Sequence, residues 1–138
     1  MLAKDIMSKK PTFLSPSATI KEAANEMLNH DFGFIPVGEN DRLIGAVTDR
    51  DIVVKAVAEG KDPNKTTLKD VMSEGIQFCF ETDDLEKITN KMEKLQIRRL
   101  VVLDKDKRMT GIISLGDIVT KSKDARISSE LTEAVSKD

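Results

Sequence analysis

Two stretches of the chain place apolar residues three and four positions apart, the spacing that gathers side chains on one face of an α-helix. The first stretch contains Ile20, Ala23, Ala24, Met27 and Leu28, and the second contains Leu85, Ile88, Met92 and Leu95. Thr19 and Glu22 fit a capping box at the start of the first stretch. Either Asp83 or Asp84 has the chemistry to cap the second. The pattern predicts two amphipathic helices.

Short apolar runs on both sides of these helices predict strands. In the first half, one strand is expected before the helix, over residues 12–14, and two after it, over 34–37 and 43–47. In the second half, the corresponding strands are expected over 77–80, 100–103 and 109–113. The turn-rich segments GEND and DKDKR join the paired strands. A further helix is expected to begin near Asp49 and again near Leu115. The predicted order is β-α-β-β-α, twice, which defines a mixed α/β (α+β) fold.

The chain repeats itself at an offset of 65 residues, where AKDIMS lies over LKDVMS. One residue is then inserted in the second copy, after which GxxT-x-x-D of the first copy lies over GxxS-x-x-D of the second. Agreement over about 50 residues indicates one supersecondary unit used twice, and each half of about 60 residues would be marginally stable alone. The predicted domains are a first repeat at 1–62 and a second repeat at 66–122.

The helix DIVVKAVAEG, residues 51–60, is apolar around most of its circumference, whereas a helix with one solvated side has only an apolar stripe. Either the other half of the chain or a second chain must cover it, and we expect a homodimer. The tail, residues 123–138, has apolar residues at helical spacing. It forms either a docked helix or a frayed polar terminus.

Charge and composition exclude several classes of partner. The 22 Lys and Arg residues and the 24 Asp and Glu residues are interspersed and leave a net charge of −2, so no basic field favours nucleic acid. Nucleic-acid binding through Arg98, Arg99, Lys105, Lys107 and Arg108 is a third, weaker alternative. No apolar run approaches the roughly 20 residues that cross a bilayer, and the start of the chain lacks the apolar core of a secretion signal. We expect a cytoplasmic protein without membrane contact.

Residues for catalysis are scarce. The chain has one histidine and one cysteine, and it lacks a metal-ligand cluster, a GxSxG motif and a Walker loop. His30 is expected at a helix end rather than as a base, and Cys79, between two phenylalanines, as a buried thiol. We therefore predict no catalytic residue, no metal site and no enzyme, and the remaining classes are binding and assembly.

Each unit combines a D[IV]MS lead-in, a strand ending in GxxT or GxxS, and an Asp three residues on. In this combination, the chain resembles a tandem pair of CBS domains over roughly residues 1 to 122. The resemblance implies two repeats packed about a pseudo-twofold axis, and two such pairs joined through helices into a disc-shaped homodimer. It also implies a regulatory module, because many members bind AMP, ADP, ATP or S-adenosylmethionine in their clefts. These compounds would act as regulatory ligands, and no cofactor is required. With no enzyme or channel attached, the signal would pass to a separate, unknown effector protein.

The resemblance places the ligand at Thr48 and Asp51 and at Ser114 and Asp117. A hydroxyl at a helix start suits phosphate, and a carboxylate one turn later can accept both hydroxyls of a ribose. The same spacing also fits a capping box with no ligand at all. The alternative to a sensor is therefore a ligand-independent scaffold or interaction protein in which these residues only cap helices.

Differences between the copies suggest further binding residues. Arg50, beside Asp51, is replaced by Gly116 in the second copy, whereas Arg98-Arg99 replaces Gly33-Phe34. The stretch QIRRLVVLD resembles the segment before the second strand in CBS pairs whose basic residues contact phosphates. The resemblance therefore implies phosphate recognition by Arg98 and Arg99, and guanidinium groups suit bidentate phosphate contacts, so Arg50 is a candidate as well. A solvated strand end is the alternative for Arg98 and Arg99. The apolar pairs Ile35-Pro36 and Leu100-Val101 are expected to wall an adenine ring, although alternate strand residues face opposite sides and half of these would pack in the core.

Overall fold

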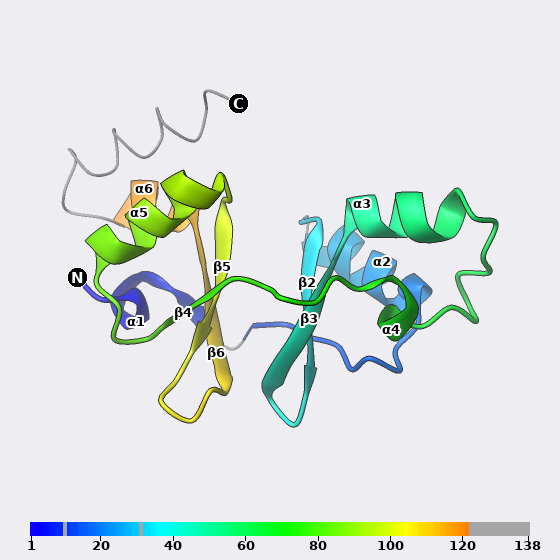
Figure 1. Cartoon of the computed structure of the whole chain (residues 1–138), viewed down its shortest axis with the longest axis horizontal. Helices are drawn as coiled ribbons and strands as arrows, with labels where there is room; N and C mark the ends of the chain where they lie inside the picture. The colour runs from blue at the N-terminus through cyan, green and yellow to red at the C-terminus, as the bar shows by residue number, and fades with distance from the viewer. Residues whose placement is uncertain (10, 31, 122–138) are drawn as a thin grey trace. The chain divides into compact units, whose positions relative to one another are not determined.

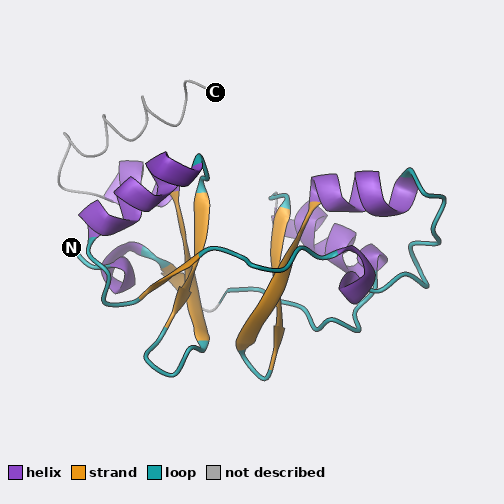
Figure 2. Cartoon of the chain, viewed as in Figure 1, coloured by secondary structure: helices purple, strands orange, loops and turns teal. Residues whose placement is uncertain are grey.

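A computed structural model describes residues 1–9, 11–30 and 32–121 of the chain. Helices and strands are interleaved along these residues (Figures 1 and 2). The chain divides into two compact units: unit 1 comprises Met1–Pro11 and Gln77–Asp138, and unit 2 comprises Thr12–Ile76. The tail predicted over 123–138 lies outside the described residues.

Unit 1 is built on a four-stranded sheet in the order β1-β6-β5-β4. Its strands are β1 (Ser8–Lys9), β4 (Phe78–Phe80), β5 (Arg99–Leu103) and β6 (Met109–Ser114). β4 is parallel to β5, whereas β6 is antiparallel to both β5 and β1. The helices within the described part of the unit, which ends at residue 121, are α1 (Ala3–Ile6), α5 (Leu85–Leu95) and α6 (Leu115–Lys121).

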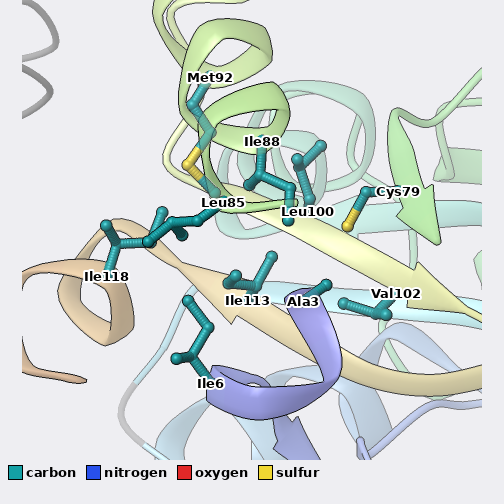
Figure 3. Close-up of a cluster of buried hydrophobic side chains, with 10 residues drawn as sticks. All are labelled: Ala3, Ile6, Cys79, Leu85, Ile88, Met92, Leu100, Val102, Ile113 and Ile118. Atoms are coloured by element: carbon teal, nitrogen blue, oxygen red, sulfur yellow. The ribbon is translucent and has the colours of Figure 1, made fainter. Parts of the chain in front are cut away.

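The core of unit 1 lies between the sheet and these three helices (Figure 3). The buried side chains come from α5 (Leu85, Ile88, Met92), from the strands (Cys79, Leu100, Val102, Ile113) and from α1 and α6 (Ala3, Ile6, Ile118). Three of the four apolar residues predicted for the buried face of α5 are therefore in this core, whereas Leu95 is 40% exposed. The Asp84 side chain caps α5 by accepting the Lys87 N–H over 2.8 Å, so Asp84 is the predicted cap that the structure uses.

The described residues of unit 2 form a two-stranded antiparallel sheet, one helix of 11 residues and three helical segments of four or five residues. The strands are β2 (Phe34–Glu39) and β3 (Arg42–Thr48), and the helices are α2 (Ile20–His30), α3 (Asp49–Ile52), η1 (Val53–Val57, a π-helical continuation of α3) and α4 (Leu68–Val71). Its core consists of Ile20, Ala23, Val37, Val47, Ala56, Leu68 and Val71. The capping box predicted at the start of α2 is present, because the Glu22 N–H donates to Thr19 Oγ1 over 3.2 Å and the Thr19 N–H to Glu22 Oε2 over 3.0 Å.

Each unit takes its lead-in helix from the other sequence repeat. α1 begins the first repeat, but it belongs to unit 1, where the Ala3 N–H donates to the carbonyl oxygen of Asp83 over 2.9 Å. α4 begins the second repeat, but it belongs to unit 2, where the Leu68 N–H donates to the carbonyl oxygen of Ala18 over 2.9 Å. The compact units thus differ from the sequence repeats by an exchange of these lead-in helices.

The mixed helix and strand content confirms the predicted fold class, and the second repeat shows the complete order β4-α5-β5-β6-α6. The strand predicted over 12–14 is wrong, since only Leu14 pairs, in an isolated bridge to Val37. The partner strand explains this difference. It has Pro36 where the second repeat has Val101, and proline lacks the N–H that the ladder needs.

Candidate functional site

The Thr48-x-x-Asp51 motif forms a reciprocal capping box at the junction of β3 and α3. The Asp51 N–H donates to Thr48 Oγ1 over 3.0 Å, and the Thr48 N–H donates to Asp51 Oδ2 over 2.9 Å. Two amide groups that a helix start leaves without partners are satisfied in this way. The capping role proposed as the alternative to ligand binding is therefore real in unit 2.

The Ser114-x-x-Asp117 motif repeats this geometry at the junction of β6 and α6. The Asp117 N–H donates to Ser114 Oγ over 3.0 Å, and the Ser114 N–H donates to Asp117 Oδ2 over 3.0 Å. The side chains of Asp51 and Asp117 are 13% and 18% exposed, so both reach the surface. Capping uses one lone pair of one oxygen and leaves further acceptor capacity on each carboxylate.

The glycine of each motif lies where a lead-in segment crosses the strand. A Cβ on Gly45 would stand 2.9 Å from the Ser73 carbonyl oxygen, and one on Gly111 would stand 2.8 Å from that of Ser8. Both distances are shorter than real Cβ contacts, so only glycine permits this approach. The D[IV]MS segment and the GxxT or GxxS strand are therefore one structural assembly, although they come from different repeats.

Each motif carboxylate has a lysine partner that the sequence prediction did not include. Lys55 Nζ lies 3.2 Å from Asp51 Oδ1, and Lys121 Nζ lies 3.5 Å from Asp117 Oδ1, both at i,i+4 spacing. The signal was present in the sequence, because DIVVK in the first repeat matches DIVTK in the second.

Arg98 and Arg99 lie beside the second motif. Arg99 is the cross-strand partner of Ser114, and the Leu115 N–H donates to the carbonyl oxygen of Arg98 over 2.8 Å. Both arginines are exposed. The structure thus brings these two candidates to the same end of the sheet as Ser114 and Asp117.

At the first motif, Phe34 takes the place of Arg99 as cross-strand partner of Thr48. Asp49, which the sequence prediction overlooked, packs its carboxylate against Gly33, and its N–H donates to the Gly33 carbonyl oxygen over 3.0 Å. Arg50 is exposed on α3. The first motif therefore has one candidate cation, Arg50, next to an additional anion, whereas the second has two candidate cations and an apolar Leu115 at the position of Asp49.

The apolar candidates fall on both faces of their strands. Ile35, Pro36, Leu100 and Val101 are all buried. Leu100 packs with Val102 in the core of unit 1, and the alternation of side chains turns Val101 to the opposite face. Of the second pair, Val101 is thus the candidate for an adenine wall, and Leu100 serves the core.

A surface cavity of about 330 Å³ in unit 1 lies away from the residues predicted to bind an adenosine ligand. Phe80, Glu81, Thr82, Leu103, Asp104 and Lys105 line it. Leu103 and Arg99 are the two ends of β5, so this cavity is at the opposite end of the sheet from Ser114.

The other residues considered for chemistry have structural places. Cys79 is 2% exposed, which confirms the predicted buried thiol, and burial together with the nearby Asp83 carboxylate raises its pKa from 9.0 to about 12. His30 ends α2, where its Nε2 lies 3.1 Å from Glu26 Oε2.

Among residues 1–9, 11–30 and 32–121, no group of three or more His, Cys, Asp or Glu residues is placed to hold a metal ion. Within the same ranges, no helix is long and apolar enough to cross a membrane.

Comparison with known proteins identifies the family. A family model for the CBS domain matches residues 3–57 and again residues 68–124. The chain belongs to the CBS-domain family, with two tandem domains.

Relatives and solved structures agree with this assignment. Hypoxic response protein 1 of Mycobacterium tuberculosis is 38% identical over 117 residues, which cover 84% of this chain and 81% of the relative. The CBS domain-containing protein YhcV of Bacillus subtilis is 39% identical over 115 residues, covering 83% and 81%. A crystal structure of the hypoxic response protein with two coordinated zinc ions superposes with a TM-score of 0.79 at 36% identity, covering 88% of this chain and 98% of that one.

A second solved structure is informative about ligands. The CBS domain pair of protein MJ0100, in complex with 5′-methylthioadenosine and S-adenosylmethionine, superposes with a TM-score of 0.74 at 30% identity, covering 87% of this chain and 94% of that one. Three enzymes also match, but this chain spans only 22 to 23% of their length.

Proposed function

We propose that the chain is a non-enzymatic regulatory module that binds an adenosine-containing ligand at its two Thr/Ser-x-x-Asp motifs. The observation that supports this most strongly is the acceptor capacity of the two carboxylates. Oδ2 of each accepts one backbone N–H and Oδ1 faces one lysine, while each carboxylate oxygen has two lone pairs. At Asp117, one lone pair on each oxygen is left for the two hydroxyls of a ribose. At Asp51, the Ser73 hydroxyl also donates to Oδ1 over 3.5 Å, a long contact that a ribose hydroxyl would replace. A homologous pair in complex with two adenosine compounds supports the same ligand class.

The two motifs favour different adenosine compounds. At the second motif, the exposed guanidinium groups of Arg98 and Arg99 suit a phosphate, so this site takes AMP, ADP or ATP. At the first motif, the Asp49 carboxylate beside Gly33 repels a phosphate and offsets the charge of Arg50. The first site therefore takes an adenosine compound without phosphate, of which S-adenosylmethionine is an example. Val37 belongs to the core of unit 2, so alternation along β2 turns Pro36 to the opposite face, as it does Val101 on β5. Pro36 and Val101 would wall the adenine.

We further propose that the module acts in the cytoplasm as a homodimer and signals to a separate effector protein. Val53, Val54 and Val57 are 57%, 49% and 66% exposed, and Leu28 of α2 is 79% exposed. Apolar side chains gathered on neighbouring helices favour association with a second copy. A ligand would alter affinity for the effector only by binding one arrangement of the module better than another.

A thermal-shift panel with AMP, ADP, ATP and S-adenosylmethionine tests the ligand class. A ligand present at about 100 times its dissociation constant stabilises the folded state by roughly 2.7 kcal/mol. We expect a rise in melting temperature with at least one phosphate-bearing compound and with S-adenosylmethionine. The absence of a shift with all four would exclude these ligands.

The completeness of both capping boxes favours a second candidate, a ligand-independent scaffold. In that case Thr48, Asp51, Ser114 and Asp117 would act only by stabilising α3 and α6. Substitution of Asp51 and Asp117 would then lower the free energy of unfolding, and no ligand would bind either the unaltered or the substituted chain.

A further inference from the structure

Lys55 connects the first motif to a lead-in helix. In addition to Asp51 Oδ1, its Nζ lies 3.2 Å from the carbonyl oxygen of Val71 and 3.3 Å from Ser73 Oγ. An ammonium group has three hydrogens, and these three oxygens can accept one each. Val71 is the last residue of α4, so its carbonyl is among those that a helix end leaves without an intrahelical partner.

Lys121 makes the corresponding connection in unit 1. Its Nζ lies 3.5 Å from Asp117 Oδ1 and 3.3 Å from the carbonyl oxygen of Ile6. Ile6 is the last residue of α1 and stands in the first lead-in where Val71 stands in the second. The same three-part arrangement of carboxylate, lysine and helix end therefore occurs independently in both units.

We propose that Lys55 and Lys121 are positioning residues that tie the motif carboxylates to the lead-in helices, so that a change at the carboxylate passes to the helix that docks beside it. For ligand binding this inference rests on the proposed function, because the carboxylate is the proposed ribose acceptor. The lysine fixes the orientation of Oδ1 and holds the end of α4 or α1 at the same time.

The connection reaches the lead-in helix of each unit. α4 follows the segment that leads from the first repeat into the second, and α1 lies at the start of the chain. Occupancy of the first motif is thus transmitted to α4, and occupancy of the second motif to α1. By thermodynamic reciprocity, a partner that holds either helix in place strengthens ligand binding at the corresponding motif.

Hydrogen exchange of the full chain without ligand tests the link itself. Asp51→Asn keeps an oxygen for the cap but removes the oxygen that faces Lys55 and that also accepts the Ser73 hydroxyl over 3.5 Å, and Lys55→Met removes the ammonium group alone. The Met72 amide therefore reports the lysine link, and the Ser73 amide reports both contacts. Each change should speed exchange of the Met72 and Ser73 amides about 3-fold, a modest effect because the pair is partly exposed. At Met72, the double variant should exchange no faster than Lys55→Met, and Lys55→Arg should stay close to the unaltered chain.

Lys121→Met is the matched control, since it should speed exchange of Met7 in unit 1 and leave Met72 and Ser73 unchanged. The link is wrong if either Asp51→Asn or Lys55→Met leaves those two amides unaffected, or if the two effects on Met72 multiply in the double variant.

Saturating AMP and S-adenosylmethionine then serve as probes. A bound probe should slow exchange of the lead-in helix of its own unit, and this slowing should vanish when the lysine of that unit is methionine. Equal slowing in the methionine variant would overturn the inference. If neither probe binds, the proposed function fails for these compounds, while the ligand-free comparison still decides whether the lysine joins carboxylate and helix.

Discussion

The backbone of Ser73 passes so close to Gly45 that a Cβ on the glycine would stand 2.9 Å from the Ser73 carbonyl oxygen. Hydrogen bonds hold this approach, because the Ser73 N–H donates to the carbonyl oxygen of Ala46 over 2.9 Å and the Ala46 N–H donates to that of Ser73 over 3.1 Å. The lead-in segment of the second repeat is thereby fastened to the strand that ends in Thr48.

Gly45→Ala should therefore destabilise the chain. The added methyl group must displace backbone as well as the Met72 side chain, and overpacking of this kind costs about 1–3 kcal/mol. Chemical denaturation measures the change. Gly116→Ala is the matched control, because a Cβ there would lie 3.6 Å from Ser114 Oγ, an ordinary contact. A loss of stability no larger for Gly45→Ala than for Gly116→Ala would contradict the close approach.

Replacing Arg98 and Arg99 together by alanine should weaken AMP binding at the second motif about 10-fold, since charge-assisted contacts to phosphate are lost. Affinity for adenosine, which lacks the phosphate, should change little. Isothermal titration of both compounds measures the two effects, with Arg50→Ala as the comparison at the first motif. Equal losses for AMP and adenosine would show that the arginines do not select for phosphate.

Asp49→Asn should allow phosphate at the first motif. Removing the carboxylate beside Gly33 lifts the repulsion, so the affinity of this site for AMP should rise relative to its affinity for S-adenosylmethionine. A chain that also has Asp117→Asn isolates the first site for the titration. If the ratio of the two affinities did not change, Asp49 would not determine which ligand the first motif binds.

A charge on the exposed valines of η1 should prevent homodimer formation. Val53→Glu with Val57→Glu would place two carboxylates in the proposed apolar contact, which is costly when they are buried without partners. Light scattering after size exclusion should show a dimer for the unaltered chain and for the exposed control Lys61→Glu, and a monomer for the valine variant. A dimeric valine variant would place the contact elsewhere.

Cys79 should be unreactive in the folded chain. Burial raises the pKa of its thiol from 9.0 to about 12, so little thiolate exists near neutral pH, and a disulfide reagent should react at least about 100-fold more slowly than after unfolding in guanidinium. The Cys79 thiol has a higher pKa in the folded chain than in the unfolded chain. Its contribution to the free energy of unfolding is therefore complete below pH 9 and is lost as the pH rises toward 12. Rapid labelling of the folded chain would contradict this burial.

Periodicity and repetition were sufficient to predict most elements, because most apolar residues at helical spacing in α5 are buried, and so are Ile20 and Ala23 of α2. Leu28 and Leu95, at the same spacing, are exposed. They could not predict that α1 packs in unit 1 and α4 in unit 2, because a hydrogen bond such as that from the Ala3 N–H to the Asp83 carbonyl oxygen does not affect the spacing of apolar residues. The strand predicted over 12–14 failed for a reason located in its partner, Pro36. The apolar spacing within one segment does not indicate that its partner strand lacks a hydrogen-bond donor.

The candidate site was predictable in part. The Thr/Ser-x-x-Asp motifs and Arg98-Arg99 were found by comparing the repeats, and the structure places Arg99 opposite Ser114. The lysines of DIVVK and DIVTK repeat just as clearly, but their role depends on the carbonyl oxygens of Val71 and Ile6, which only the fold brings near. The position of Asp49 against Gly33 likewise depends on backbone geometry.

Titration of the full chain with AMP and S-adenosylmethionine, before and after Asp51→Asn with Asp117→Asn, tests the proposed sensor function most directly. We predict that both compounds bind the unaltered chain and that the double variant, still folded by circular dichroism, loses both by at least about 10-fold, since a charged hydrogen-bond acceptor is removed. Undiminished binding by the double variant, or no binding to the unaltered chain, would contradict a ligand site at these carboxylates.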